Sequence, residues 1–288
     1  MYDARKSGPQ FSGNGIFALA ILAVVAIAFA LVWVFAAPSP GSGGALKLHA
    51  NVPVTLAEKM PSRDETRFLN AMARLQPAAL APLDHALTRD AADREAQIKS
   101  INDAAGIAVF ANISSLGHIS TEDLNGMLDT MIMQVTSAQR QGSPLCNGRS
   151  WLQFENKSVE QVESWMATNG YSYAAMYDDS MVATADFMEA LARAKSNPTR
   201  HGNFRNSDQK ALEAAMMGLM TNPDLMQLAA SGGSDRQQLA RTNVCAVTKT
   251  LLQTARDLPD GTKGRAWAAA FDRPEFGQAL DQLQKFGF

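Results

Sequence analysis

Residues 121–135, TEDLNGMLDTMIMQV, predict how the rest of the chain folds. Thr121 provides a helix start, and the apolar residues that follow it recur at helical spacing. They are Leu124, Met127, Leu128, Met131 and Val135. A second stretch repeats the pattern with Val244, Val247, Leu251, Leu252 and Ala255. Each set covers one face of an amphipathic helix that has to pack on a core.

Helix starts and stops recur throughout residues 46–288. Three pairs have the spacing of a capping box, and two prolines occupy first helical positions. These are Ser62 with Glu65, Ser158 with Gln161, Ser234 with Gln237, Pro223 and Pro274. Residues 46–50 alternate weakly and predict a short extended segment, but no run of β-branched residues is long enough for a sheet. The sequence therefore predicts an all-α domain of roughly eight to ten helices.

The N-terminal region predicts a membrane anchor. Residues 16–37 contain no charge, Gly or Pro, and as a helix they reach about 33 Å, enough to cross the hydrocarbon core of a bilayer. Arg5 and Lys6 precede the span, so the positive-inside rule places the N-terminus in the cytoplasm. The expected organisation is a cytoplasmic tail (1–15), a transmembrane anchor (16–37), a flexible linker (38–45) and a helical extracytoplasmic domain (46–288). A cleaved signal peptide ending before Ala37 is the alternative.

With either a retained anchor or a cleaved signal peptide, the domain is exported. The Ala-rich composition favours the periplasmic side of a bacterial inner membrane. An exported domain meets oxidising conditions, so Cys146 and Cys245, the only cysteines, are expected to form a disulfide. Within the anchor, Ala23, Ala26 and Ala30 share one face and would allow self-association. The lipid bilayer is thus one expected partner.

The sequence argues against several classes of protein. A net charge of -2 and a pI near 6.1 argue against nucleic-acid binding. No nucleotide-binding loop, zinc helix or serine-hydrolase elbow occurs, and the four histidines are too far apart to pair as metal ligands on one helix, so no metal or cofactor is expected. Glu163-Ser164 resembles the start of the signature of lytic transglycosylases, which are lysozyme-like and all-helical. The resemblance implies a catalytic Glu163, although Met166 to Ala175 do not continue the signature.

Methionine is unusually frequent, with 14 residues in the chain. One cluster comprises Met216, Met217, Met220 and Met226. Thioether side chains suit adaptable grooves that bind partner helices, but the same spacing also fits core filling. Two functions of different class follow. The favoured one is a non-enzymatic module that binds or scaffolds another envelope protein or the cell wall, and the alternative is a peptidoglycan-acting hydrolase.

Overall fold

A computed structural model describes residues 47–154, 157–169, 173–223, 225–226 and 236–271. Within these ranges the chain is helical, and its only β-type pairing is an isolated antiparallel bridge between Asn147 and Asn243. The all-α fold predicted from the sequence is confirmed.

The helices are short to medium in length and follow one another closely. In chain order they are α2 (Val54–Lys59), α3 (Arg63–Leu75), α4 (Leu80–Arg89), α5 (Arg94–Ala111), α6 (Thr121–Arg140), α7 (Gly148–Leu152), α8 (Val159–Thr168), α9 (Tyr173–Ser196), α10 (Asn206–Leu219), α12 (Arg236–Arg241), α13 (Val244–Asp257) and α14 (Asp260–Phe271). Three 3-10 turns are η1 (Pro77–Ala79), η2 (Ile113–His118) and η3 (Pro144–Cys146).

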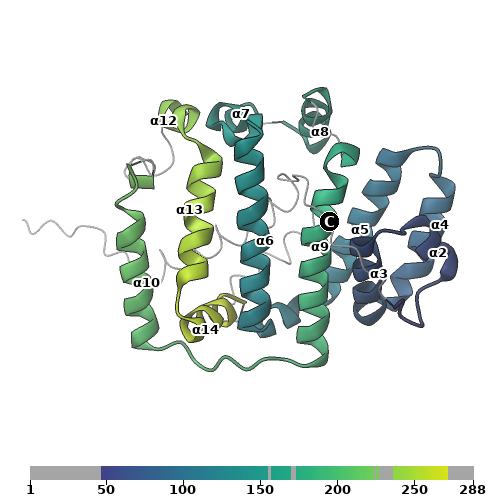
Figure 1. Ribbon diagram of the computed structural model, residues 1–288, viewed down its shortest axis with the longest axis horizontal. Helices are drawn as coiled ribbons and strands as arrows, with labels where there is room; N and C mark the ends of the chain where they lie inside the picture. Colours follow the sequence, from purple (N-terminus) through teal and green to yellow (C-terminus); the bar gives the residue numbers. More distant parts are fainter. Residues whose placement is uncertain (1–46, 155–156, 170–172, 224, 227–235, 272–288) are drawn as a thin grey trace, which may run out of the picture.

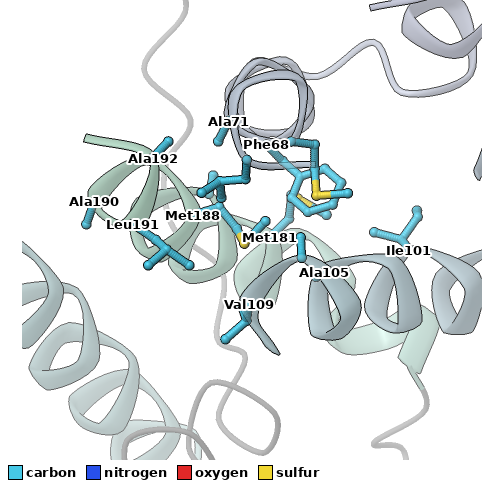
Figure 2. Close-up of a cluster of buried hydrophobic side chains, with 14 of the residues drawn as sticks. Phe68, Ala71, Ile101, Ala105, Val109, Met181, Met188, Ala190, Leu191 and Ala192 are labelled. Carbon is cyan, nitrogen blue, oxygen red and sulfur yellow. The ribbon is translucent and has the colours of Figure 1, made fainter. Parts of the chain in front are cut away.

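Four long helices, α10, α13, α6 and α9, stand side by side in a row (Figure 1). Helices α7 and α12 cover one end of the row, and α14 crosses the other. Helices α2 to α5 form a second group beyond α9, which packs extensively on α3 and α5. Figure 2 shows the core at this junction, where Phe68 of α3, Ala105 of α5 and Met181 of α9 gather in one buried cluster. The core is thickest around α9, whereas α10 lies at the outer edge of the row.

The predicted helix starts form where the structure describes them. Ser62 accepts from the amide of Glu65 at 3.2 Å, and Glu65 accepts from that of Ser62 at 2.9 Å, which completes a capping box. Ser158 and Gln161 exchange the equivalent bonds. Helix α6 begins at Thr121. Ser234 and Pro274 lie outside the described residues.

The predicted inward face is confirmed for α6 and only in part for α13, where Leu252 is buried and Ala255 packs against the core. All five apolar residues predicted for α6 are buried. In α13 the buried line is Cys245, Thr248 and Leu252, while Val247 and Leu251 are half-exposed. The buried line thus shares Leu252 with the predicted face and adds Cys245, which forms the disulfide, and Thr248.

The predicted disulfide joins Cys146 in η3 to Cys245 at the start of α13, with a Cα–Cα distance of 4.7 Å. Beside it, the amide of Gly148 donates to the carbonyl of Thr242 at 3.0 Å. A Cβ atom at Gly148 would lie 1.7 Å from the carbonyl oxygen of Leu239. Only glycine permits this approach, which lets α7 pack on α12.

The membrane anchor predicted at 16–37, the tail before it and the linker after it lie outside the described residues. Among the helices that the structure describes, none is long and apolar enough to span a bilayer. The predicted extended segment is described from Lys47 onward, where it forms no strand. The side chain of Asn70 on α3 instead bonds the carbonyl of Lys47 at 3.0 Å and the amide of His49 at 2.7 Å.

Candidate functional site

The methionines that the sequence singled out lie on helix α10 (Met216 and Met217), directly after it (Met220) and six residues further on (Met226), and most of them face solvent. Met217 is 68% exposed, Met220 is 42% exposed and Met226 is 48% exposed, whereas Met216 is half-buried. Core filling, the simpler interpretation of this cluster, is therefore wrong for three of the four side chains. Ala214, which lies between Glu213 and Ala215, is also exposed. We call Ala214, Met217 and Met220 the methionine surface.

The methionine surface is continuous along one side of the helix. Residues three apart on a helix are neighbours, so Ala214, Met217 and Met220 follow one another along that side. The amide of Met220 still bonds the carbonyl of Met216 at 3.0 Å, so helical geometry persists beyond the end of α10. A Cβ atom added at Gly218 would have no neighbour within 4 Å, which leaves open space beside Met217.

One buried ion pair fixes the start of α10. Asp208 is 1% exposed and accepts two bonds of 2.7 Å from the Arg265 guanidinium on α14. The hydroxyl of Thr262 donates to it at 2.8 Å and the amide of Arg205 at 2.9 Å. These bonds, from Arg265 above all, hold the pKa of Asp208 well below its usual range. The carboxylate is therefore fully charged and tied to α14 at neutral pH.

The rest of α10 packs lightly. It contacts mainly α13 and α14, and no residue of α10 belongs to the continuous hydrophobic core. Leu219 is buried, while Leu212 and Met216 are half-buried. An ion pair at one end and a thin apolar contact along its length hold α10 in place, with its outer side open.

Glu163 lies on α8, where its side chain is outside what the structure describes. Its neighbours hold the helix to the domain: the Trp165 ring packs edge-on against Phe154 with centroids 5.0 Å apart, and Met166 is buried. Helices α8 and α10 lie on opposite sides of α6 and α13 (Figure 1), so the two candidate sites suggested by the sequence are not brought together. A catalytic role for Glu163 stays a prediction.

In a large cluster of charged side chains, the described residues form hydrogen bonds and ion pairs with one another. Arg67 donates to Asp64 at 2.9 Å, to Asp186 at 2.5 Å and to Glu189 at 2.8 Å. Burial opposes the charged form of Arg67, but bonds from these three carboxylates outweigh it and raise its pKa. Thr130 of α6 donates to the other oxygen of Asp186 at 2.6 Å. The cluster therefore ties α3 and α6 to α9.

A second polar cluster is buried between α3 and α9. The hydroxyl of Tyr177 donates to Glu65 at 2.6 Å, and the Arg94 guanidinium lies 4.4 Å from the centre of the Tyr177 ring. Burial and the neighbouring Glu65 carboxylate raise the pKa of Tyr177. In the described part of the chain every buried side-chain nitrogen or oxygen has a hydrogen-bond partner. No buried side-chain nitrogen or oxygen in these residues therefore requires a ligand as its partner.

Metal-ligating side chains are dispersed in the described ranges, where no three His, Cys, Asp or Glu residues gather closely enough to hold an ion. His201, for example, bonds the carbonyl of Ile119 at 2.8 Å through Nε2. Its ring packs so closely on Gly264 that a Cβ atom there would lie 2.2 Å from Nδ1. This histidine therefore links the segment before α10 to α14.

Sequence reasoning missed the Asp208–Arg265 pair, which positions the candidate site. The residues are 57 positions apart, and neither stands in a motif. The only local signal was an aspartate in the first turn of a helix, which is common at any helix start. Comparison with known proteins finds no family model, no curated protein and no solved structure that matches the chain.

Proposed function

We propose that this chain is a single-pass membrane protein of a bacterial envelope, anchored by residues 16–37, whose periplasmic helical domain binds another envelope protein without catalysing a reaction. The observation that carries the proposal is the methionine surface of α10. Burial of exposed methionine against a partner is favourable, because it removes apolar surface from water, whereas burial of lysine or glutamate removes a hydrated charge.

The chemistry of this surface favours a protein over the cell wall as the partner. Glycan strands are polar and need directed hydrogen bonds, whereas Met217 and Met220 offer flexible apolar contact. Unbranched thioether side chains adjust to the shape of a partner helix, as in other helix-in-groove interfaces. The open space at Gly218 would let such a helix approach closely.

Two observations support placement outside the cytoplasm. The disulfide between Cys146 and Cys245 is of a kind that persists in oxidising compartments and is rare in the cytosol. The apolar segment at 16–37 exceeds the roughly 7 to 15 residues of an ordinary signal-peptide core, which favours a retained anchor. A domain held near the membrane surface is restricted to partners in the same envelope.

The proposal is tested by introducing a charge into the methionine surface. Val54 on α2 has the same exposed fraction as Met217, 68%, and lies at the opposite end of the domain (Figure 1), so Val54→Lys is the matched control for Met217→Lys. Full-length tagged protein is purified from detergent-solubilised envelopes. An envelope protein that co-purifies with the wild type and with Val54→Lys should be absent from the Met217→Lys preparation, because burying lysine in an apolar contact costs free energy.

The hydrolase alternative is tested on the same preparations. The wild type should release no more soluble fragments from purified peptidoglycan than Glu163→Gln does. A muramidase activity that disappears in Glu163→Gln, with the circular dichroism spectrum unchanged, would replace the binding proposal with the enzyme.

A further inference from the structure

The methionines that the structure describes divide into a buried set and an exposed set. Met72 and Met188 are fully buried, and five others are nearly so. These five are Met60, Met127, Met131, Met166 and Met181. The exposed set comprises Met133, Met217, Met220 and Met226. Among the described residues, therefore, most of the methionines that solvent reaches freely lie at the end of α10 or shortly after it.

No free thiol competes with these thioethers for an oxidant. The chain has only two cysteines, and both are joined in the disulfide between η3 and α13. Cys245 is also fully buried. Thiolates and thioethers are the side chains that oxidants convert most readily, and exposure increases their susceptibility. With both thiols already oxidised, the exposed methionines are the side chains most open to a peroxide.

Oxidation of Met217 or Met220 by a peroxide balances within the two reactants. A lone pair of the thioether sulfur attacks one oxygen of hydrogen peroxide, a sulfur–oxygen bond forms and the O–O bond breaks. The other oxygen leaves as hydroxide and takes the proton from the new S–OH group, which gives the sulfoxide and water. Sulfur loses the two electrons that the peroxide gains. A dithiol reductase reverses the change: it supplies two electrons and two protons, becomes a disulfide and releases the oxygen as water.

The sulfoxide changes what the methionine surface can bind. A flexible apolar side chain becomes polar, with an oxygen that accepts hydrogen bonds from water. Burying that oxygen against an apolar partner helix removes its water and costs free energy. Met217 and Met220 are three residues apart on one side of the helix, so both oxygens would lie in the same contact.

We propose that Met217 and Met220 are sites of reversible oxidation, and that their sulfoxides switch off binding through the methionine surface. This inference rests on the proposed function, since it requires a partner that binds there. Oxidation and binding exclude one another, because a bound partner covers the thioethers that the peroxide attacks. A peroxide would thereby keep the partner from binding, and reduction of the sulfoxides would restore the contact.

The first measurement follows oxidation in the purified full-length protein. Hydrogen peroxide is added for increasing times, and tandem mass spectrometry of the peptides records the gain of one oxygen at each methionine. Met217 and Met220 should be oxidised at least about ten times faster than Met72 and Met188, because a peroxide reaches a buried sulfur only when the fold opens locally. Equal rates at the exposed and the buried residues would overturn the proposal.

The second measurement tests whether these two side chains control binding. Tagged full-length protein is oxidised, the peroxide is removed, and detergent-solubilised envelopes that have not been oxidised are added. Capture of the envelope protein should weaken at least about tenfold in affinity, which corresponds to about 1.4 kcal/mol. Met217→Leu with Met220→Leu keeps the surface apolar without a thioether, so its capture should not change on oxidation.

The matched control is Met133→Leu on α6. Met133 is 44% exposed, close to the 42% of Met220, but it lies outside the methionine surface. Oxidised Met133→Leu should therefore lose capture as the oxidised wild type does. Treatment of the oxidised wild type with a methionine sulfoxide reductase should restore capture, and a permanent loss would contradict the reversible switch.

A second variant covers the case in which the leucine variant misfolds. Met217→Gln with Met220→Gln imitates the polar sulfoxides and should lose capture without any peroxide. Undiminished capture by the oxidised wild type or by the glutamine variant would overturn this inference and leave the proposed function standing. An equal loss on oxidation in the leucine variant would do the same. If the untreated wild type captures no envelope protein, the proposed function fails and this inference fails with it.

Discussion

Replacing Asp208 with asparagine should loosen α10 without unfolding the rest of the domain. The change removes the charge that Arg265 binds and leaves that guanidinium, 16% exposed, beside a neutral amide. Removing one partner of a buried ion pair costs about 3 to 5 kcal/mol, because the other charge stays desolvated. Since α10 lies outside the continuous core, most of this cost should appear locally.

Hydrogen exchange measured by mass spectrometry resolves the effect by helix. At about 1.4 kcal/mol per factor of ten, a cost of about 3 to 5 kcal/mol would make the amides of residues 206–219 exchange on the order of 100 to 1,000 times faster in Asp208→Asn. Amides of α3 and α9 should be unaffected. The matched control is Asp129→Asn, which removes a similar two-bond pair with Arg256 at 2.8 and 3.1 Å on the exposed side of α6. An exposed pair of this kind contributes little to stability, because water and salt screen it.

The stabilisation of α10 by the Asp208 carboxylate should depend on pH in one direction. Folding lowers the pKa of Asp208. The stabilisation that this carboxylate provides is therefore fully present above its pKa in the unfolded chain, and it is lost as the pH falls through its pKa in the folded protein. The difference in the stability of α10 between the wild type and Asp208→Asn should therefore be constant near neutral pH and shrink below about pH 4. Equal exchange of α10 in Asp208→Asn and Asp129→Asn would refute the argument that the buried pair holds the helix.

Four further outcomes are expected. Replacing Cys146 and Cys245 together with alanine should lower the unfolding free energy in urea by about 4 to 5 kcal/mol, the loop-closure value for about 100 residues, and an unchanged midpoint would contradict this. Gly148→Ala should lower the melting temperature, at a cost of about 1 to 3 kcal/mol, because its Cβ meets a backbone carbonyl at 1.7 Å. Gly126→Ala, on the open side of α6, should instead stabilise by about 0.5 to 1 kcal/mol. Intact mass spectrometry of membrane fractions should find the N-terminal segment retained, and a mature chain beginning at Ala37 would reject the anchor.

Features set by neighbouring residues could be predicted from the sequence. The capping box of Ser62 and Glu65 is confirmed because both of its bonds lie within one helical turn. The buried face of α6 is confirmed because its apolar residues alone satisfy the helical period. The disulfide could be predicted because the chain has only two cysteines and was expected to lie in an oxidising compartment. Only one pairing is possible between two cysteines.

Features set by distant contacts could not be predicted. In α13 the hydropathy pattern identified Leu252 but missed Cys245 and Thr248, because Cys245 is buried at a disulfide to a turn 99 residues earlier and Thr248 is polar. The exposure of Met217 depends on how α10 lies at the edge of the row, which Asp208 and Arg265 determine together. Methionine is common both in cores and in binding surfaces, so its spacing could not separate the two.

The proposed role of the outer side of α10, in a domain tethered to the membrane, is tested most directly by photo-crosslinking. A photo-crosslinking amino acid is placed at residue 217 of the full-length protein in growing cells, with residue 54 as the matched position. Irradiation should give a discrete adduct to one envelope protein from position 217 and none from position 54, and the position-217 adduct should disappear when Met220→Lys is added. The same adducts from both positions, or none from position 217, would contradict the account.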